Sequence, residues 1–296
     1  MMLYIKAMRI HQWVKNVLVF VPYLAAHHYK NQRELAVVCV AFLIFGLIAS
    51  SVYILNDLLD VDDDRQHPSK CHRPFASRAL STRAGWFLWP MLLILGITGA
   101  VALLPVQFVG ALVAYFLLTL AYSLRLKRLP IIDVVVLAGL YTMRIVAGAV
   151  AIDVPLSFWL FTFSIFLFTS LAFVKRFSEL LAAEEDRPSA LLRGRGYHRN
   201  DLQAVGNFGA ASGYLAVLVF SLYIQDTLTA KLYAEPKVLW IVCPLLLFWI
   251  SRIWLLTHRG AMHDDPVVFA IKDKTSWVVM GMMMIAMGVA RVGIRL

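Results

Sequence analysis

The chain has 296 residues, of which 60% are hydrophobic and only 16% are charged, and its mean hydropathy is +0.73. This balance excludes an ordinary soluble globular protein, in which about a quarter of the residues are charged. The apolar residues come in runs of about 20, the number that a helix needs to cross the hydrocarbon of a bilayer. We therefore expect an all-α integral membrane protein.

Nine segments are predicted to be transmembrane helices: 12–29, 33–56, 82–103, 106–124, 131–151, 156–177, 201–225, 236–257 and 275–293. The first is short and carries Lys15 and Asn16, so an amphipathic helix lying in the membrane interface is the alternative for it. The N-terminus lacks the pattern of a cleavable signal peptide, so we expect the chain to insert intact. Cys39, Cys71 and Cys243 are not placed to form a disulfide or a metal pair.

The charged residues predict the orientation of the chain in the inner (cytoplasmic) membrane. If the N-terminus lies in the cytoplasm, most of the 28 Lys and Arg fall on the cytoplasmic side, and an odd number of helices puts the C-terminus outside. Most of the 18 acidic residues share the cytoplasmic side, and only Glu34, Asp153, Asp226 and Glu235 fall on the outer side. Loops that served only topology would not need acidic clusters beside the basic ones. The combination indicates a cytoplasmic site for a polyanion, with a metal ion between some carboxylates and the ligand.

The second predicted helix ends in the string NDLLDVDDDRQHPSKCHRP, which begins at Asn56. Its Asp57, Asp60 and Asp64 are spaced i, i+3 and i+7, so they share one face if the helix continues. Carboxylates this close repel one another unless a cation lies between them. Hard oxygen ligands favour Mg²⁺, which typically bridges one or two carboxylates to phosphate oxygens.

Cationic side chains follow this motif at once: Arg65, His67, Lys70 and Arg73. We expect them to hold phosphate oxygens that the metal leaves free. The alternative is a solvated acidic turn with flanking basic residues. That alternative explains neither the position at a membrane helix end nor the spacing of the aspartates.

Two further features lie around the fifth predicted helix. The loop before it, YSLRLKRLPIID, holds Tyr122 and Lys127, and taken alone it is an ordinary positive-inside loop. Arg144 lies well inside the helix. An arginine there is costly unless it faces a polar cavity or a partner, so Arg144 is a candidate site residue.

The segment after the sixth predicted helix contains KRFSELLAAEED and RGRGYHRNDL, with Lys175, Arg176, Glu179 and Tyr197 as candidate binding residues. Lys175 and Glu179 are one helical turn apart, so an ion pair within the helix is the alternative. The loop 259–276 is expected to be a lid or a wall. Its His263 stands beside aspartates, but without a second histidine at ligand spacing it is weak evidence for a metal.

The string of Asn56, Asp57, Asp60 and Asp64 at the end of a second helix resembles the first aspartate motif of the UbiA superfamily of intramembrane polyprenyl transferases. The resemblance covers essentially the whole chain, because a YxxxxK motif after the fourth helix and polar residues after the sixth follow in family order. It implies one transmembrane domain over 1–296, with nine helices around a central cavity and a cytoplasmic cap. It also implies that the three aspartates are catalytic and bind Mg²⁺.

The sequence after the sixth predicted helix differs from that of many superfamily members, and this difference indicates the branch. Members that prenylate aromatic rings usually show DxxxD followed by GxKS after the sixth helix, whereas this chain has KRFSEL and RGRGYHRNDL. RIHQWVKNVLVFVP, HPSKCHRP, KRFSEL and DDPVVFAIKDKTS look like the branch that makes polyprenyl-phosphate phosphoribose. That resemblance implies phosphoribosyl pyrophosphate as donor, a polyprenyl phosphate as acceptor, and pyrophosphate as the released product.

A phosphoribosyl donor and a lipid phosphate together carry more phosphate groups than an aromatic acceptor does, so they require more cations. The chain supplies such cations from several cytoplasmic segments: Lys15, Lys70, Arg73, Lys127, Arg144, Lys175 and Arg176. Positive-inside topology alone would also fill those loops. The argument therefore favours the phosphoribosyl branch without excluding others.

Two other functions stay open at this stage. One is a prenyltransferase that moves a polyprenyl group from its diphosphate to a phenol or quinone precursor, and the other is a transporter or carrier of lipid phosphates. Lipid length and homo-oligomer formation are also open, and no nucleic acid partner is expected. Some relatives carry a fused hydrolase-like phosphatase domain that we do not find here, so we expect another protein to perform any dephosphorylation.

Overall fold

The computed structural model describes residues 2–28, 31–66, 70–182, 195–227, 232–262 and 265–293. The predicted all-α class is confirmed, since the regular elements in these ranges are helices. Eight of them are long and apolar enough to cross a membrane. Their α-helical parts are α3 (Gln32–Leu59), α5 (Thr82–Leu103), α6 (Val106–Leu124), α7 (Ile132–Ala151), α8 (Phe158–Leu181), α9 (Leu202–Gln225), α11 (Val242–His258) and α13 (Lys274–Val292).

The first predicted span has a different conformation from the other eight. It is a 3₁₀-helix, η1 (Ile10–Phe20), continued by the short helix α2 (Val21–Ala25). A 3₁₀-helix rises about 2.0 Å per residue against about 1.5 Å for an α-helix, so the two pieces together extend roughly 30 Å, close to the hydrocarbon thickness. The number of nine spans therefore stays a prediction, because this segment is not among the eight helices identified by length and composition.

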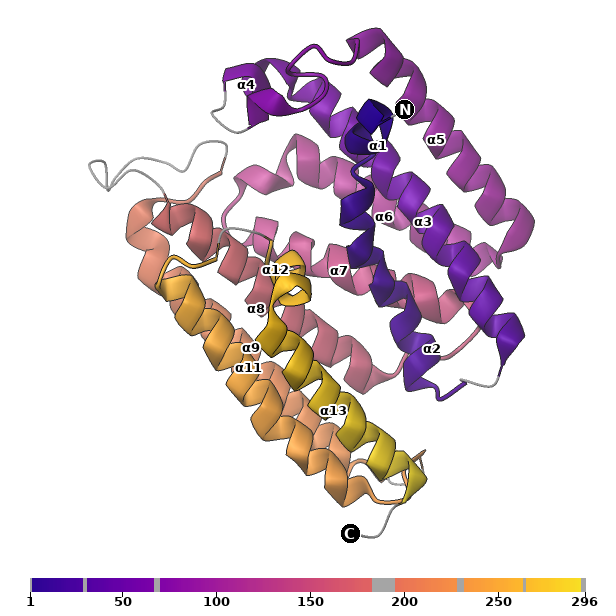
Figure 1. The fold of residues 1–296 in the computed structure, drawn as a ribbon, viewed down its shortest axis with the longest axis vertical. Coiled ribbons are helices and arrows are strands. Elements are labelled where there is room, and N and C mark those ends of the chain that lie inside the picture. Colours follow the sequence, from indigo (N-terminus) through magenta and orange to yellow (C-terminus); the bar gives the residue numbers. More distant parts are fainter. Residues whose placement is uncertain are drawn as a thin grey trace. The chain divides into compact units, whose positions relative to one another are not determined.

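The described chain divides into two compact units, of which the first contains residues 1–126 and 143–156. Its central element is α3, which packs against α5, η1, α6 and the N-terminal helix α1 (Met2–Ala7) (Figure 1). Two serines tie α3 to these neighbours. Ser50 Oγ donates to the Met8 carbonyl and accepts a hydrogen bond from Trp13 Nε1, and Ser51 Oγ donates to the Trp89 carbonyl.

The end of α3 carries the aspartate string. The α-helix ends at Leu59 with Asp60 as its C-cap, and a second short helix, α4 (Val61–Gln66), follows directly. The backbone N–H of Asp60 still donates to the Asn56 carbonyl, and that of Asp64 donates to the Asp60 carbonyl. The helix that was predicted to continue past Asp60 therefore does so with a kink at that residue (φ −96°, ψ 9°). The next described element after α4 is the 3₁₀-helix η2 (Lys70–His72).

The second unit contains residues 127–142 and 157–296, so α7 contributes its first half to this unit and its second half to the first. Here α8 packs along α9, α9 packs against α11, and α11 packs against α13 (Figure 1). Gly209 permits the close contact of α9 with α11, because a Cβ atom at that position would overlap the Trp254 ring. Trp254 Nε1 in turn donates to Ser170 Oγ of α8 at 3.1 Å.

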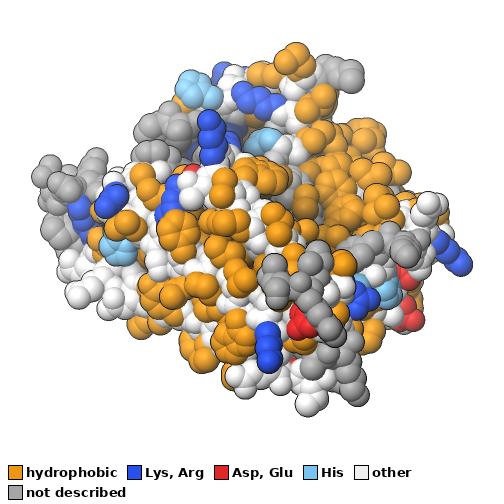
Figure 2. All heavy atoms as spheres, turned by 60° about the horizontal axis from the view of Figure 1, so that its bottom comes forward, with side chains coloured by type: hydrophobic (Ala, Val, Ile, Leu, Met, Phe, Trp, Pro, Cys, Tyr) orange, Lys and Arg blue, Asp and Glu red, His pale blue; other side chains and the backbone are white. Residues whose placement is uncertain are grey.

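Hydrophobic side chains make up much of the exposed surface. Phe87, Val106, Phe158 and Ile285 are each more than two-thirds exposed, and Figure 2 shows such side chains spread over much of one face of the molecule. Water would disfavour so large an exposed apolar area, whereas lipid tails cover it. Together with the eight apolar helices, this surface identifies a multi-pass integral membrane protein.

A partly buried ion pair joins α11 to the start of α13. Arg252 donates from Nη1 to Asp273 Oδ2 at 2.7 Å and from Nη2 to Oδ1 at 3.0 Å, and the backbone N–H and hydroxyl of Ser276 donate to the same carboxylate. Burial on its own would raise the pKa of Asp273, but the hydrogen bonds from Arg252 and Ser276 outweigh it and hold the pKa below its ordinary value of 3.8.

A lowered pKa in the folded state means that the unfolded state binds more protons, so the ionised Asp273 stabilises the fold above its ordinary pKa and loses that contribution as the pH falls through the folded pKa. We expect Asp273→Asn to lower the stability by about 1 kcal/mol at pH 7. The difference from the wild type should shrink below about pH 4. Thermal unfolding in detergent at several pH values measures it, and a difference that grows on acidification would contradict the assignment.

Candidate functional site

Two aspartates and two arginines meet at the end of α3 in the first unit, and we call this group the aspartate–arginine cluster. Arg73 Nη1 lies 3.1 Å from Asp57 Oδ1 and 2.6 Å from Asp64 Oδ2, and Arg9 Nη2 lies 2.6 Å from Asp57 Oδ1. Asp57 and Asp64 are each only 3% exposed, whereas the arginines are about a quarter exposed. Two carboxylates of the aspartate string, seven residues apart, thus contact the same guanidinium.

Arg9 was not predicted to belong to the site. It lies 48 residues before Asp57 in the sequence, directly before η1, in the left-handed conformation with φ 51°. Its guanidinium also stacks over the Tyr53 ring at 5.4 Å from the ring centre. A non-glycine residue in this conformation is costly and is often found at functional sites. The sequence signals were its positive charge near the predicted cytoplasmic end and its place at the start of RIHQWVKNVLVFVP.

The oxygen atoms of this cluster are of the kind that binds a hard divalent cation. Asn56, the residue before Asp57, has a buried Oδ1 that accepts no hydrogen bond from the described residues, so this oxygen is available to a ligand. One Arg73 nitrogen already lies between the two carboxylates, where a cation is electrostatically favoured. Within the described residues no three His, Cys, Asp or Glu side chains form a metal-binding group. Mg²⁺ does not require one, because it is usually bound by one or two carboxylates, water and phosphate oxygens.

The other predicted residues near the motif lie at different depths. Asp60 is half-buried at the kink, and the two aspartates that pair with Arg73 are Asp57 and Asp64. Lys15 is half-buried in η1, and Lys70 is exposed in η2. His67 lies outside the described residues. The structure thus brings Asn56, Asp57, Asp64 and Arg73 together and leaves the roles of Asp60, Lys15 and Lys70 as predictions.

Arg144 has the partners that its position inside a membrane helix requires. It is 4% exposed, and its Nε donates to Asn16 Oδ1 at 3.0 Å while Nη2 donates to the Tyr115 hydroxyl at 2.9 Å. Its guanidinium also lies 5.4 Å and 5.0 Å from the ring centres of Phe45 and Tyr115. These contacts reduce the cost of the charge and tie α7 to η1 and α6. Substrate binding by Arg144 stays a prediction.

A second buried arginine lies in the second unit. Arg176 and Asp133 are both fully buried, with Nε 2.9 Å from Oδ2, and Arg176 also pairs with Glu179. The Tyr197 hydroxyl donates to Asp133 Oδ1 at 2.7 Å and accepts from the Ile131 N–H at 2.7 Å. Burial, and then the hydrogen bond to Asp133, raise the pKa of the Tyr197 phenol above its ordinary value. The predicted residues Arg176, Glu179 and Tyr197 are thus joined in one network that fixes the start of α7 to α8.

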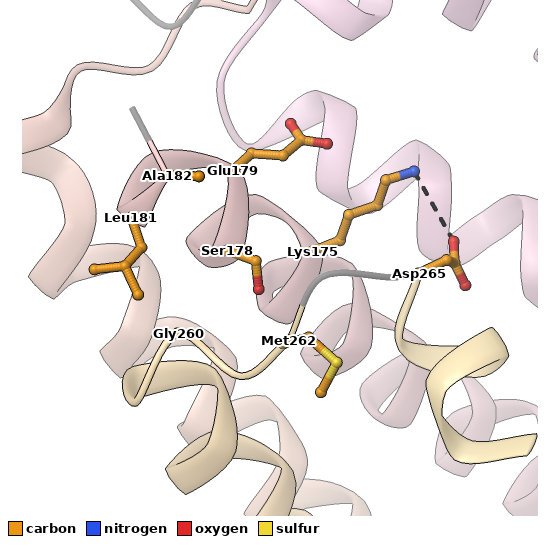
Figure 3. A pocket seen from close by; sticks show the side chains of 8 residues that line it. All are labelled: Lys175, Ser178, Glu179, Leu181, Ala182, Gly260, Met262 and Asp265. Carbon is orange, nitrogen blue, oxygen red and sulfur yellow. Dashed lines mark ion pairs between the residues drawn. The ribbon is translucent and has the colours of Figure 1, made fainter. Parts of the chain in front are cut away.

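Lys175 and Glu179 line a pocket of about 490 Å³ at the end of α8, together with Ser178, Gly260 and Asp265 (Figure 3). The loop 259–276 therefore supplies one wall of this pocket, although His263 and Asp264 lie outside the described residues. Lys175 Nζ faces Asp265 Oδ2 at 3.9 Å. The alternative of an ion pair between Lys175 and Glu179 is not what the structure shows, because Glu179 pairs with Arg176 and lies near Arg195 instead.

The YxxxxK pair lies at the end of α6. Tyr122 is half-buried in α6, and Lys127 is half-buried in the short 3₁₀-helix η3 (Leu126–Arg128). The Lys127 carbonyl accepts a hydrogen bond from Arg195 Nη1 at 3.4 Å. Substrate binding by Tyr122 and Lys127 stays a prediction.

The model of the UbiA prenyltransferase family matches residues 17–272. The uncharacterized protein y4nM of Sinorhizobium fredii is 40% identical over 277 residues, which are 93% of this chain and 53% of that protein, so the chain spans about half the length of this relative. The nodulation protein NoeC of Azorhizobium caulinodans is 37% identical over 94% of this chain and 89% of that protein. The decaprenyl-phosphate phosphoribosyltransferase of Mycobacterium tuberculosis is 37% identical over 282 residues, which are 91% and 88% of the two chains.

Solved structures share the fold at low sequence identity. The structure of a UbiA homolog from Archaeoglobus fulgidus bound to GPP and Mg²⁺ is similar with a TM-score of 0.70, covering 97% of this chain and all of that one. The two sequences are 15% identical, so this likeness establishes the fold alone.

Proposed function

The chain belongs to the UbiA prenyltransferase family, and we propose that it is a transferase that moves the 5-phosphoribosyl group of phosphoribosyl pyrophosphate to a polyprenyl phosphate and releases pyrophosphate. The observation that carries the proposal is the aspartate–arginine cluster, in which two buried carboxylates share one guanidinium. The residue before Asp57, Asn56, also has a side-chain oxygen that accepts no hydrogen bond from the described residues. Such a cluster suits a diphosphate bound together with a divalent cation. The 37% identity to a relative named decaprenyl-phosphate phosphoribosyltransferase supports this branch.

In the proposed reaction the bond between ribose C1 and the diphosphate oxygen breaks, and a bond from C1 to an oxygen of the lipid phosphate forms. The acceptor oxygen is already ionised at neutral pH, so no general base is needed. Attack on the face opposite to the leaving group gives a β-linked polyprenyl phosphoribose. The chain has to stabilise the negative charge that builds up on the departing pyrophosphate.

Arg9 and Arg73 are the groups that would perform this task directly. Each arginine side chain is about a quarter exposed while its partner carboxylate is buried, and we expect the N–H groups that do not bind the carboxylates to donate to phosphate oxygens. Mg²⁺ held by Asn56, Asp57 and Asp64, with Asp60 close to them in the sequence, would neutralise further charge on the leaving group. The carboxylates also hold the two arginines in place before substrate arrives.

We further propose that residues 1–296 form one UbiA-like domain of the inner membrane, with the N-terminus and the site in the cytoplasm and the C-terminus outside. A single family model spans residues from both units, which supports one domain. The distribution of Lys and Arg supports the orientation.

Mass spectrometry of lipid products tests the proposed activity. The protein in detergent, given phosphoribosyl pyrophosphate, Mg²⁺ and a polyprenyl phosphate, is expected to add one phosphoribosyl group to the lipid and to release pyrophosphate, and chelation of the metal should stop both. If phosphoribosyl pyrophosphate stays inert while a polyprenyl diphosphate prenylates a phenol, the chain is an aromatic prenyltransferase. Binding of phosphate ligands without any product would indicate a carrier.

A further inference from the structure

A second pocket, of about 510 Å³, lies in the first unit between α4 and the start of α5. Figure 1 shows both elements at the same end of α3. Two buried apolar side chains, Phe75 and Leu80, form one part of its lining, and the charged part consists of Arg65, Arg78 and Arg83. The pocket therefore combines an apolar wall with three cations, and we call it the arginine pocket.

Two of these three arginines have no partner among the described residues. Arg65 pairs with Asp62, which is 84% exposed and does not line the pocket. Arg78 and Arg83 are exposed, and in the part of the chain that the structure describes their side chains make no hydrogen bond and no ion pair. Each guanidinium has five N–H donors. An anion in the pocket can therefore accept hydrogen bonds from both without displacing a protein contact.

The charged groups around the pocket do not neutralise these two arginines. Positions 65–132 contain no Asp or Glu, so residues 67–69, which lie outside the described ranges, add no negative charge. Asp64 is paired with Arg73, and none of the residues that line the pocket is acidic. Within the first unit the arginine pocket thus carries an excess of positive charge, which favours an anionic ligand.

The arginine pocket lies at one end of a membrane span. The helix α5 is long and apolar enough to cross a membrane, and it begins at Thr82. About one turn after Arg83, Trp86 is 50% exposed and Phe87 is 72% exposed. Tryptophan is enriched at the boundary between the bilayer and water. Thr82 and Arg83 are therefore expected at the level of the lipid headgroups, where the phosphates of the bilayer lie.

The positive-inside rule accounts for arginines at this end of α5, but it does not require a pocket around them. Arg78 has a left-handed backbone with φ 63°, a conformation that is costly for a residue other than glycine. A loop that served only topology could avoid this cost by placing its charge at a neighbouring position. The arrangement is better explained by a ligand that both arginines contact.

The walls of the arginine pocket are held in place by the fold. The Leu80 N–H donates to the Pro74 carbonyl at 2.9 Å, which closes the loop before α5. The first turn of α5 packs directly on the apolar wall, because a Cβ atom at Gly85 would overlap the Phe75 ring and the Leu58 side chain. The pocket is thus formed without a ligand, so binding does not have to order this loop.

We propose that the arginine pocket binds the phosphate of an anionic phospholipid of the surrounding bilayer. Arg78 and Arg83 donate to its oxygens, and the hydroxyls of Ser81 and Thr82, which also line the pocket, supply further donors. The acyl chains lie along the exposed apolar side chains of α5. The inference goes beyond the proposed transfer reaction and does not depend on it, because it concerns residues outside the aspartate–arginine cluster.

Native mass spectrometry of the purified protein in detergent tests this site. Phosphatidylglycerol and phosphatidylcholine both contain a phosphodiester and differ in net charge, so each is titrated and the Kd of the first bound lipid is measured. We expect the wild type to bind phosphatidylglycerol at least about tenfold more tightly than phosphatidylcholine. The double variant Arg78→Asn, Arg83→Gln should reduce this preference to about twofold or less, since only dispersed surface charge then attracts the lipid.

The substitutions are chosen to preserve the fold. Asparagine adopts the left-handed backbone at position 78 more readily than most residues do, and glutamine has nearly the helix propensity of arginine at position 83. Arg33→Gln with Arg125→Gln is the matched control, because it removes two charges from exposed positions of the same unit that do not line the pocket. If the double variant does not run as a single species in gel filtration, each single variant replaces it, with an expected preference of about threefold.

Loss of the preference in the pocket variant, with the preference retained in the control, supports the assignment. An unchanged preference in the pocket variant, or an equal loss in the pocket variant and the control, would overturn it, because lipid binding would then follow net charge alone. Displacement of phosphatidylglycerol by inorganic phosphate, but not by chloride at the same ionic strength, would assign the pocket to a free phosphate instead. Tighter binding of polyprenyl phosphate through the same two arginines would make it a substrate site and would likewise overturn the phospholipid assignment. A negative result here leaves the proposed transfer reaction intact, since the lipid products measure that reaction separately.

Discussion

Replacing Asp57 with asparagine is expected to lower the turnover number with phosphoribosyl pyrophosphate by roughly 10²- to 10³-fold. Asparagine keeps the size of the side chain and removes the charge that holds Arg9 and Arg73 at the end of α3. The fold should survive, because Arg73 keeps Asp64 as a partner and Arg9 is exposed enough to be solvated. Initial rates of pyrophosphate release at saturating substrate measure the effect.

Asp62 offers a matched control within the same string. Its side chain is 84% exposed and pairs only with Arg65 among the contacts described, in the helical i, i+3 arrangement. Asp62→Asn therefore makes the same chemical change a few residues away without touching the aspartate–arginine cluster, and its turnover should stay within about twofold of the wild type. Equal turnover in Asp57→Asn and Asp62→Asn would remove the aspartate–arginine cluster from the reaction.

The sequence predicted the long helices well because hydropathy is a local property. The predicted spans 82–103 and 106–124 coincide with α5 and α6 at both ends. The span 156–177 ends four residues before α8 does, because the helix continues through the polar residues Ser178 and Glu179 to Leu181. The first span was the least well predicted, because hydropathy does not distinguish a 3₁₀-helix from an α-helix.

The candidate site was predicted where its residues are close in sequence. Asp57 and Asp64, two of the three aspartates expected to share one face, contact the same Arg73 across the kink at Asp60, and their role in metal binding stays a prediction. Contacts between distant segments left no local pattern. Arg9 reaches Asp57 across 48 residues, and Arg144 reaches Asn16 across 128 residues. Composition could indicate that a buried arginine needs a partner, but only the fold identifies which one it has.

Arg176 illustrates how a charged residue can serve the site through the fold. Sequence reasoning placed it among the phosphate-binding cations, and its binding of substrate stays a prediction. In the structure it is fully buried, and its contacts are with Asp133 and Glu179. A residue in this position affects the pocket at the end of α8 indirectly, because it holds Glu179, which lines that pocket.

Replacing Arg176 with methionine is therefore expected to lower the free energy of unfolding by about 3–5 kcal/mol, because it leaves the buried Asp133 carboxylate without its charged partner. Tyr197 still donates one hydrogen bond to that carboxylate but supplies no charge. Adding Asp133→Asn to Arg176→Met should recover a large part of the loss, since the uncompensated charge is then gone. Thermal and denaturant unfolding in detergent measure the three proteins.

An exposed ion pair gives the comparison that separates burial from pairing. Arg65→Met removes the partner of Asp62, which is 84% exposed, so water solvates the remaining carboxylate and the stability should change by no more than about 0.5 kcal/mol. The two substitutions delete the same chemical group and differ in the burial of the charge left behind. If Arg176→Met and Arg65→Met destabilised the protein equally, the Arg176–Asp133 pair would not anchor α7 to α8. The position of Glu179 in the pocket at the end of α8 would then require another explanation.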